Sequence, residues 1–444
     1  MPKNAAENFD KLPEEKIEPE KDIKKDSRNH LILAMNYLEN KYKFRYNLFT
    51  ARPEYAVVNG KVHDYNHLNE RDFDNIHNEV KITGKVRVGR DDFKSLVSSK
   101  FISQDYDPIA DYLGSLKKWD GEDRIRLFLQ QVQLQDESHR ELLIKYFTKW
   151  FTTLVGSLVD NRCYNEYCFV FTGEQGRGKT RFFHSLVPLP LRLQYTFTGN
   201  FNPRDKDHEE MLGTKIIINL DEMGTMNRTD EETLKTTMSK RYVTLRRAYG
   251  RAPIHLYRKA SFCGSHNREE FLTDLSGNRR WLPFAIHNID IDKGFDIGLL
   301  YSQAMAMYKD GFNIYMDRTE IAELEAHNEQ FRYISMEEQM VISNYRVPSD
   351  QESANDIGIR YMDTTDIVHS LASMEKYKKM NVNDTVLKRF GQALKRVGFE
   401  RVTKVIPNKK PYPIKVWKVV PITENQAADL KSGRLNSFDT RDLI

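Results

Sequence analysis

The feature that most constrains this chain is a glycine-rich segment, GEQGRGKT, at residues 173–180. It matches the pattern G-x-x-x-x-G-K-[ST], follows an apolar run of strand length at 167–172 and precedes a segment of helical character. Glycines at these positions let backbone N–H groups surround phosphate oxygens at the N-terminus of a helix. The sequence therefore predicts a strand, a phosphate-binding loop and a helix, with ligand contacts from Gly173, Gly176, Arg177, Gly178, Lys179, Thr180 and Arg181.

The expected ligand of this loop is ATP with Mg²⁺. The lysine of such a loop, here Lys179, reaches the β- and γ-phosphates, and the hydroxyl of Thr180 holds the metal ion. A second apolar run, 215–220, ends at Asp221 and Glu222. Asp221 is predicted to complete the Mg²⁺ shell, and Glu222 to deprotonate the attacking water. The alternative is an acidic pair that caps a helix, but tandem acids after an apolar strand favour an ATPase over a kinase.

A third apolar run, 259–263, is followed by the residues GSHN at 264–267. A polar amide at the end of a strand beside the γ-phosphate can position the attacking water. Asn267 is the candidate for this role and His266 is the weaker one. Asparagine is also common in turns for purely local reasons, which is the alternative interpretation.

Two arginines follow in the segment DLSGNRRW at 274–281. Arg279 or Arg280 is predicted to reach across a subunit boundary and neutralise charge on the transferred phosphoryl group. The alternative places both arginines on a solvated turn or against the ring of Trp281.

Three short apolar strands with helical segments between them are typical of a parallel sheet that is covered on both faces. The predicted fold class is therefore α/β, with this core at about 160–310, and an amphipathic helix is predicted at 138–159. The expected organisation has a tail at 1–28, a mostly helical or α/β module at 29–135, a P-loop core at 136–345, a winged-helix-like domain at 356–425 and a tail at 426–444. Within the first module we expect helices at 30–38 and 91–101 and a strand with a turn at 55–62.

Residues 235–259 carry eight Lys or Arg side chains and no Asp or Glu. The pattern predicts two strands, 242–245 and 254–257, that form a hairpin. Basic residues interleaved with tyrosines suit phosphate contacts and base stacking, so this segment is predicted to bind nucleic acid. The candidates are Lys240, Arg241, Arg246, Arg247, Tyr249 and Arg251. The alternatives are a solvated basic face, or an arginine of this segment that reaches the ATP of a neighbouring subunit.

The C-terminal segment 375–418 contains 13 Lys or Arg residues and three acids. Helices at 365–373 and 383–397, followed by strands at 400–406 and 413–420, have the order of a winged helix-turn-helix, with Thr365 as a candidate N-cap. The second helix is predicted to present Lys388, Arg389, Lys395 and Arg396 to DNA. A winged helix that binds protein is the alternative.

Composition restricts the remaining possibilities. The net charge is +4 over 444 residues, which excludes a histone-like or polyacidic protein. No apolar run approaches the roughly 18 residues of a membrane span, and the N-terminus has no apolar signal segment. The three cysteines fit neither a disulfide framework nor a zinc site. We therefore expect a cytoplasmic protein without a membrane partner.

Taken together, these motifs resemble the virulence-associated protein E family, P-loop ATPases of phages and genomic islands that are related to superfamily III helicases and to the primase-helicases of mobile elements. The resemblance covers about residues 105–310. It rests on DPIADYL at 107–113, WDG at 119–121, Arg124, the phosphate loop, the LDE strand, YGR at 249–251, GSHN and DLSGNRRW. His266 stands where related chains more often have threonine, and no primase module is evident in the first hundred residues.

The resemblance implies an AAA+-like core, a hexameric or other ring, and a basic hairpin that grips single-stranded DNA. The first functional hypothesis is an ATP-dependent DNA helicase or translocase that acts in DNA replication of a phage or mobile element. The second is a nucleotide-gated switch, an initiator or a defence protein, that binds duplex DNA through its C-terminal domain without unwinding it.

Overall fold

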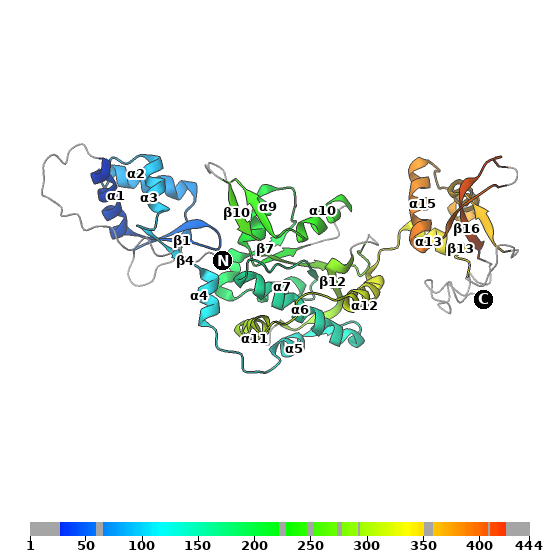
Figure 1. Cartoon of the computed structure of the whole chain (residues 1–444), viewed down its shortest axis with the longest axis horizontal. Coiled ribbons are helices and arrows are strands. Elements are labelled where there is room, and N and C mark those ends of the chain that lie inside the picture. Colours follow the sequence, from blue (N-terminus) through cyan, green and yellow to red (C-terminus); the bar gives the residue numbers. More distant parts are fainter. Residues whose placement is uncertain are drawn as a thin grey trace, which may run out of the picture. The chain divides into compact units, whose positions relative to one another are not determined.

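The computed structural model describes residues 27–58, 65–221, 228–246, 253–272, 278–291, 294–349, 358–406 and 409–422 (Figure 1). The chain divides into two compact units. The first unit contains Met1–Lys118, Leu212–Thr214 and Tyr242–Arg258, and the second contains the rest. The predicted tail at 426–444 and all of the tail at 1–28 except its last two residues lie outside the described residues.

The first unit contains a four-stranded mixed sheet in the order β3-β2-β1-β4. The module contains both helices and a sheet, as its α/β interpretation expects, and its helices cover more residues than its strands. The predicted helices at 30–38 and 91–101 are present, the second ending earlier than expected. The elements are α1 (Ser27–Lys41), β1 (Tyr42–Asn47), β2 (Arg52–Val57), β3 (Asn66–His67), α2 (Glu70–Ile82), α3 (Arg90–Val97), β4 (Ser103–Tyr106) and α4 (Pro108–Ser115).

The predicted strand with a turn at 55–62 overlaps the end of β2, and residues 59–64 lie outside the described residues. A buried ion pair explains why the sequence reveals no more of this sheet. The Nε atom of Arg45 in β1 lies 2.7 Å from Oε2 of Glu54 in β2, and Glu54 is buried. The Arg45 guanidinium also lies against the rings of Tyr65 and Tyr106. A charged pair at positions where a strand pattern needs apolar residues breaks the alternation on which prediction depends.

The predicted hairpin at 242–257 is confirmed and also belongs to the first unit. Strands β9 (Tyr242–Leu245) and β10 (Ile254–Tyr257) pair antiparallel, with Tyr242 opposite Tyr257 and Thr244 opposite His255. Val243, Leu245 and Leu256 are buried. The hairpin therefore has one apolar face and one face that carries the two tyrosines.

The second unit is built on a six-stranded sheet in the order β5-β12-β6-β11-β8-β7. All neighbouring strands are parallel except β5, which pairs antiparallel with β12. The three predicted strands are β6 (Cys168–Thr172), β8 (Ile217–Leu220) and β11 (Ser261–His266), and they are joined by β5 (Val132–Leu134), β7 (Thr196–Gly199) and β12 (Trp281–Ile289). The α/β class with a parallel sheet is thus confirmed. Strand β11 runs to His266, beyond the predicted end at Cys263, because Gly264 to His266 still pair with β6.

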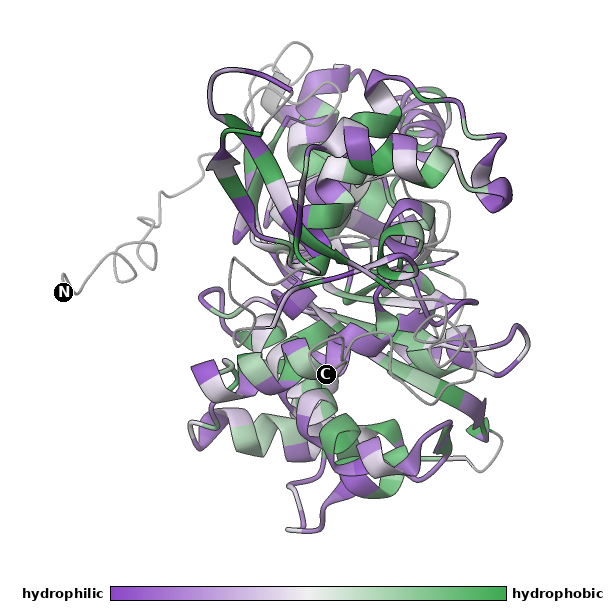
Figure 2. Cartoon of the chain, turned by 90° about the vertical axis from the view of Figure 1, so that its right-hand side faces the viewer, coloured by the Kyte–Doolittle hydropathy of each residue, from purple (hydrophilic) through white to green (hydrophobic). Residues whose placement is uncertain are grey.

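Helices pack against this sheet through large apolar side chains. The predicted helix at 138–159 is α6 (Arg140–Val159), which is buried over most of its length, and its Trp150 Nε1 donates to the carbonyl of Phe262 in β11 at 3.1 Å. Figure 2 shows hydrophobic and hydrophilic residues mixed along the helices. Among the described residues, no helix has the length and hydropathy needed to cross a membrane. The other helices are α5 (Arg124–Leu129), α7 (Lys179–Ser185), α8 (Leu189–Tyr195), α9 (Lys206–Thr214), α10 (Arg228–Met238), α11 (Ile297–Lys309) and α12 (Arg318–Asn328).

The C-terminal elements follow the predicted order of two helices and two antiparallel strands. Asp363, rather than the predicted Thr365, caps the first helix, because its side chain accepts the Asp366 N–H in a reciprocal capping box. The elements are α13 (Met336–Ile342), β13 (Tyr345–Arg346), β14 (Arg360–Met362), α14 (Thr364–Ala372), α15 (Asp384–Val397), β15 (Arg401–Lys404) and β16 (Ile414–Pro421). Strand β16 pairs with the three other strands of this group.

Candidate functional site

The glycine-rich loop connects the end of β6 to the start of α7. Gly173, Gly176 and Gly178 have φ angles of +137°, +82° and +86°, a region that favours glycine. A Cβ atom at Gly173 would lie 2.5 Å from the carbonyl oxygen of Ile286, so this position also lacks room for a side chain. The backbone N–H of Ile289 donates to the Arg177 carbonyl at 3.1 Å. Strand β12 therefore holds the loop in place.

Lys179 is the first residue of α7 and is 6% exposed. Its Nζ donates to the backbone carbonyls of Gly173 at 2.5 Å and Glu174 at 2.7 Å, and lies 3.5 Å from Oδ1 of Asn267. Burial, followed by the positive charge of Arg177, lowers the pKa of this ammonium, while Asp221 opposes the shift. The lysine is therefore held inside the loop by neutral oxygens that phosphate oxygens can replace.

Asp221 directly follows β8, at the same edge of the sheet. Ser265 in β11 donates through Oγ to Oδ1 of Asp221 at 3.3 Å. Sequence reasoning missed this serine, although the two-residue period of a strand could have placed it on the same side as Asn267. Glu222 lies outside the described residues.

The donor set fits a magnesium ion. A carboxylate, a threonine hydroxyl and phosphate oxygens are hard ligands, and Mg²⁺ in phosphate sites commonly uses one or two protein groups beside water. Asp221 is exposed at the end of its strand, and Thr180 is partly exposed in the first turn of α7. These two residues would hold the ion.

His184 is a second residue that sequence reasoning did not find. Its Nε2 lies 2.6 Å from Oγ1 of Thr198 in β7. Burial and the charge of Arg192 lower the pKa of His184, and Asp221 acts in the opposite direction. The imidazole therefore lies within the electrostatic range of the predicted metal ligand. Its position on α7 beyond the end of the loop motif gave no sequence signal.

Asn267 and His266 differ in what surrounds them. Asn267 follows β11 directly and is exposed beside Lys179. Nδ1 of His266 lies 3.0 Å from the backbone nitrogen of Arg268, and its ring stacks on that of Phe271 at 5.2 Å between centroids. Burial lowers the pKa of His266. These contacts favour Asn267 over His266 as the polar side chain beside the lysine.

The other predicted loop residues are placed as follows. Arg177 forms an ion pair with Glu174 inside the loop. Arg181 is exposed on α7. The loop thus carries charge of both signs, and only Lys179 among its basic residues is buried in the phosphate cradle.

Arg279 and Arg280 lie at the N-terminal ends of the parallel strands, and the loop extends from their C-terminal ends. They precede β12, whose first residue, Trp281, pairs in register with Cys168, the first residue of β6. The loop begins after the last residue of β6, so about five residues at ~3.3 Å each, roughly 17 Å, separate the two ends. Arg280 donates through Nη2 to Oγ of Ser239 at 3.0 Å and is partly buried, whereas Arg279 is exposed. Neither arginine is therefore placed to contact a nucleotide in the loop of its own chain.

The basic segment 235–259 is not one continuous charged surface. Lys235 and Arg258 are buried, and Lys259 donates to the carbonyl of Ser157 near the end of α6 at 2.8 Å. Lys240 forms an ion pair with Glu209 at 2.6 Å. Of the predicted DNA contacts, Lys240 is thus engaged with a carboxylate of the same chain. The carboxylate and the helix end that Lys240 and Lys259 bind lie far away in the sequence.

The remaining candidates of this segment are more accessible. Arg241 is exposed and lies 5.8 Å from the centroid of the Tyr164 ring, and Arg246 is exposed. Tyr242 and Tyr257 are 59% and 51% exposed on one face of the hairpin. Arg247, Tyr249 and Arg251 lie outside the described residues.

On α15 the predicted inward residues Phe390 and Leu394 are buried, and Lys388, Arg389 and Lys395 are exposed. Arg396, which was predicted on the exposed side, is only partly exposed. Its Nη1 lies 3.0 Å from Oε1 of Glu338 in α13, a fully buried carboxylate that also binds Arg332 at 3.3 Å. Nothing in the α15 sequence indicates a partner 58 residues away.

Comparison with known proteins identifies a family for part of the chain. The model of the virulence-associated protein E-like domain matches residues 113–333. No curated protein matches. Similar solved structures include the apo structure of the NrS-1 C-terminal region, residues 305–718, at 13% identity and a TM-score of 0.45 over 89% of this chain and 100% of that one. An A-form apo structure of the same region has a TM-score of 0.44 at 13% identity over 88% of this chain and 100% of that one.

The matched residues include the glycine-rich loop, Asp221, Asn267 and both arginines, which are among the motifs on which the family resemblance depends. The chain thus contains a virulence-associated protein E-like domain at residues 113–333.

Proposed function

We propose that this domain binds ATP with Mg²⁺ and hydrolyses it. The observation that carries the proposal is the position of β11 between β6 and β8. Because the strands are parallel, their C-terminal ends meet, and residues from three strand ends lie together: Lys179 near Asn267, and Asp221 near Ser265. Binding sites of open α/β sheets form at this edge.

Each residue has a distinct role in the proposed reaction. Lys179 exchanges its two carbonyl partners for the β- and γ-phosphates. Thr180 and Asp221 would hold Mg²⁺, which would neutralise charge on the phosphate oxygens. Asn267 orients the attacking water, and Glu222, which directly follows Asp221, accepts its proton.

We assign the arginine of the reaction to a neighbouring subunit. Arg279 is favoured over Arg280 because Arg279 is exposed and Arg280 is engaged with Ser239. Their separation from the loop of the same chain supports a role in trans. The active form is then a hexamer or another ring, in which each interface joins one loop to the Arg279 of the next subunit.

We further propose that hydrolysis drives movement along single-stranded DNA, as expected of a helicase or translocase in the replication of a phage or mobile element. The exposed hairpin face with Tyr242, Tyr257 and Arg246 supports this step. Aromatic rings stack on bases of any sequence, and arginines contact phosphates. The proposed DNA contacts of this segment are Arg241 and Arg246, with Arg247, Tyr249 and Arg251 outside the described residues, and Lys240 is engaged with Glu209.

A nucleotide-gated switch is the second candidate. It is supported by the exposed row of Lys388, Arg389 and Lys395 on α15, in a C-terminal domain that we interpret as winged-helix-like. In this model, ATP drives assembly and duplex DNA binds through α15 without unwinding.

The distinguishing experiment measures ATP turnover and strand displacement side by side. The motor predicts turnover that single-stranded DNA stimulates and displacement of a paired strand, both lost in Lys179→Ala. Duplex binding with DNA-independent turnover and no displacement would favour the switch.

A further inference from the structure

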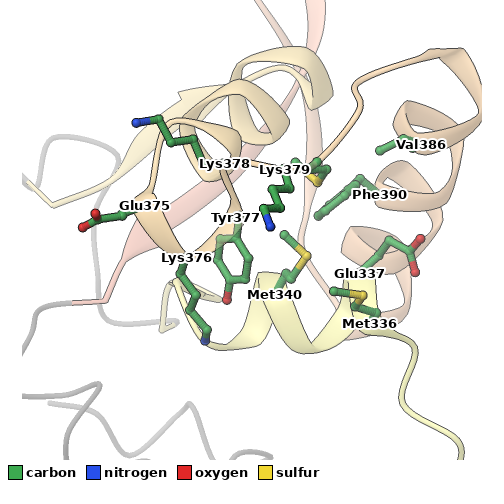
Figure 3. A pocket seen from close by; sticks show the side chains of 11 residues that line it. Met336, Glu337, Met340, Glu375, Lys376, Tyr377, Lys378, Lys379, Val386 and Phe390 are labelled. Atoms are coloured by element: carbon green, nitrogen blue, oxygen red, sulfur yellow. The ribbon is translucent and has the colours of Figure 1, made fainter.

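The C-terminal part of the second unit contains an open groove that neither the nucleotide site nor the proposed DNA surfaces use. The groove has a volume of about 640 Å³ and lies between α13, α15 and the turn at Glu375–Tyr377 with the three residues after it (Figure 3). A volume of this size is typical of a ligand pocket in proteins.

The floor of the groove is apolar and rich in methionine. Met336 and Met340 lie one turn apart on α13, and Val386 and Phe390 lie one turn apart on α15. Two helices thus present apolar i, i+4 pairs to the same space, as Figure 3 shows. Met336 is 69% exposed, which is unusual for a large apolar side chain. Methionine suits such a surface because its flexible thioether adapts to the shape of a partner.

The rim of the groove is basic. Lys376, Lys378 and Lys379 line it together with Glu337 and Glu375. Glu337 lies 3.6 Å from the guanidinium of Arg389, so part of its charge is already matched within the domain. The rim therefore has a surplus of positive charge over an apolar floor.

This combination indicates the chemistry of the partner. DNA would use the lysines, but its phosphate backbone offers nothing to a methionine and phenylalanine floor. An amphipathic helix suits both the floor and the rim of the groove, because its apolar face fills the groove and its flanking acids face the lysines. We propose that this groove binds an amphipathic, acid-flanked helix of a partner protein.

The test uses the full-length protein and a displayed peptide library. Each peptide has an amphipathic helical pattern with Leu, Met, Phe or Ile at the apolar positions and Glu, Lys or Ser at the flanking ones. We expect selection on the wild-type protein to enrich Glu flanks, and the enriched peptides, made synthetically and labelled, to bind saturably in fluorescence anisotropy.

Two variants locate the binding. Met336→Glu places an acid in the groove, and because position 336 begins α13, a glutamate there is compatible with the helix dipole. Lys378→Glu with Lys379→Glu reverses the rim. Each is expected to weaken peptide binding by about tenfold or more, the loss of one or two interface contacts. Leu193→Glu on α8 is the matched apolar control, because Leu193 is 96% exposed and outside the groove.

The paired control Lys388→Glu with Lys395→Glu separates peptide binding from DNA binding, since both lysines lie on α15 outside the groove lining. It should leave peptide affinity unchanged and reduce duplex DNA affinity if α15 contacts DNA. The proposal is overturned if selection enriches no peptides relative to Met336→Glu, or enriches Lys flanks. It is also overturned if the rim variant loses DNA affinity alone. These outcomes do not depend on ATP hydrolysis.

Discussion

The ammonium nitrogen of Lys179 lies 3.5 Å from the side-chain oxygen of Asn267, although 88 residues separate them in the sequence. The two residues extend from the ends of adjacent parallel strands, β6 through its loop and β11 directly. A group near the lysine is also near the position that a γ-phosphate would take. Under the proposed function, a change at Asn267 should affect hydrolysis without affecting the loop.

Asn267→Ala should slow ATP turnover by about 100-fold while leaving nucleotide affinity nearly unchanged, because positioning the water matters only in the transition state. Phosphate release and equilibrium binding of a labelled nucleotide check the two parts separately. His266→Ala is the comparison, and it should affect turnover less. Equal losses of affinity and turnover would argue against a role in positioning water.

Arg279→Ala should reduce turnover by about a thousandfold, the usual contribution of an arginine that acts in trans. Mixing Arg279→Ala with Lys179→Ala should restore part of the activity, because a mixed ring contains interfaces with one intact loop and one intact arginine. Arg280→Ala should reduce turnover less than Arg279→Ala does, since the Arg280 guanidinium binds Ser239 within the chain. An absence of restoration on mixing would contradict catalysis across an interface.

Ser265→Ala should raise the Mg²⁺ concentration needed for half-maximal turnover by about tenfold, because the hydroxyl orients the Asp221 carboxylate at 3.3 Å. A magnesium titration at saturating ATP measures this change. Ser265→Thr keeps the hydroxyl and serves as the control. If both variants titrate like the wild type, the serine does not orient the metal ligand.

Arg396→Gln should loosen the packing of α13 against α15, because it removes one of the two described cations that face the buried Glu338 carboxylate. Lys395→Gln, next to it and exposed, should leave the packing intact and weaken DNA binding. Hydrogen exchange of the α13 and α15 amides reports the first effect, and anisotropy with labelled duplex DNA reports the second. The opposite pattern would restore Arg396 to the DNA-binding surface.

Part of this fold could be predicted from sequence because the central strands consist largely of buried apolar residues. Cys168–Thr172, Ile217–Leu220 and the first part of Ser261–His266 are fully buried, so their apolar runs were visible. Strand β12 was not predicted, since it contains Pro283, which argues against a central strand. Strand β7 is only partly buried and carries no apolar run.

The candidate site was also predictable only in part. The order of the motifs predicted which strand ends would carry Lys179, Asp221 and Asn267, because parallel topology brings such ends together. Pairings between distant side chains were not predictable. Two residues predicted to contact DNA have such partners, Lys240 with Glu209 and Arg396 with Glu338. Charge counting cannot detect such partners, because it considers one segment at a time.

Retention of labelled ATP by the purified protein, with and without Mg²⁺, tests the central claim most directly. We expect saturable binding that requires the metal ion and that weakens by about 10- to 100-fold in Lys179→Ala, since the variant loses a charge-assisted contact with the phosphates. Lys309→Ala, at the exposed end of α11, is the control and should bind like the wild type. The account would be contradicted if the wild-type protein retains no ATP in magnesium, or if Lys179→Ala binds ATP with the same affinity as the wild type.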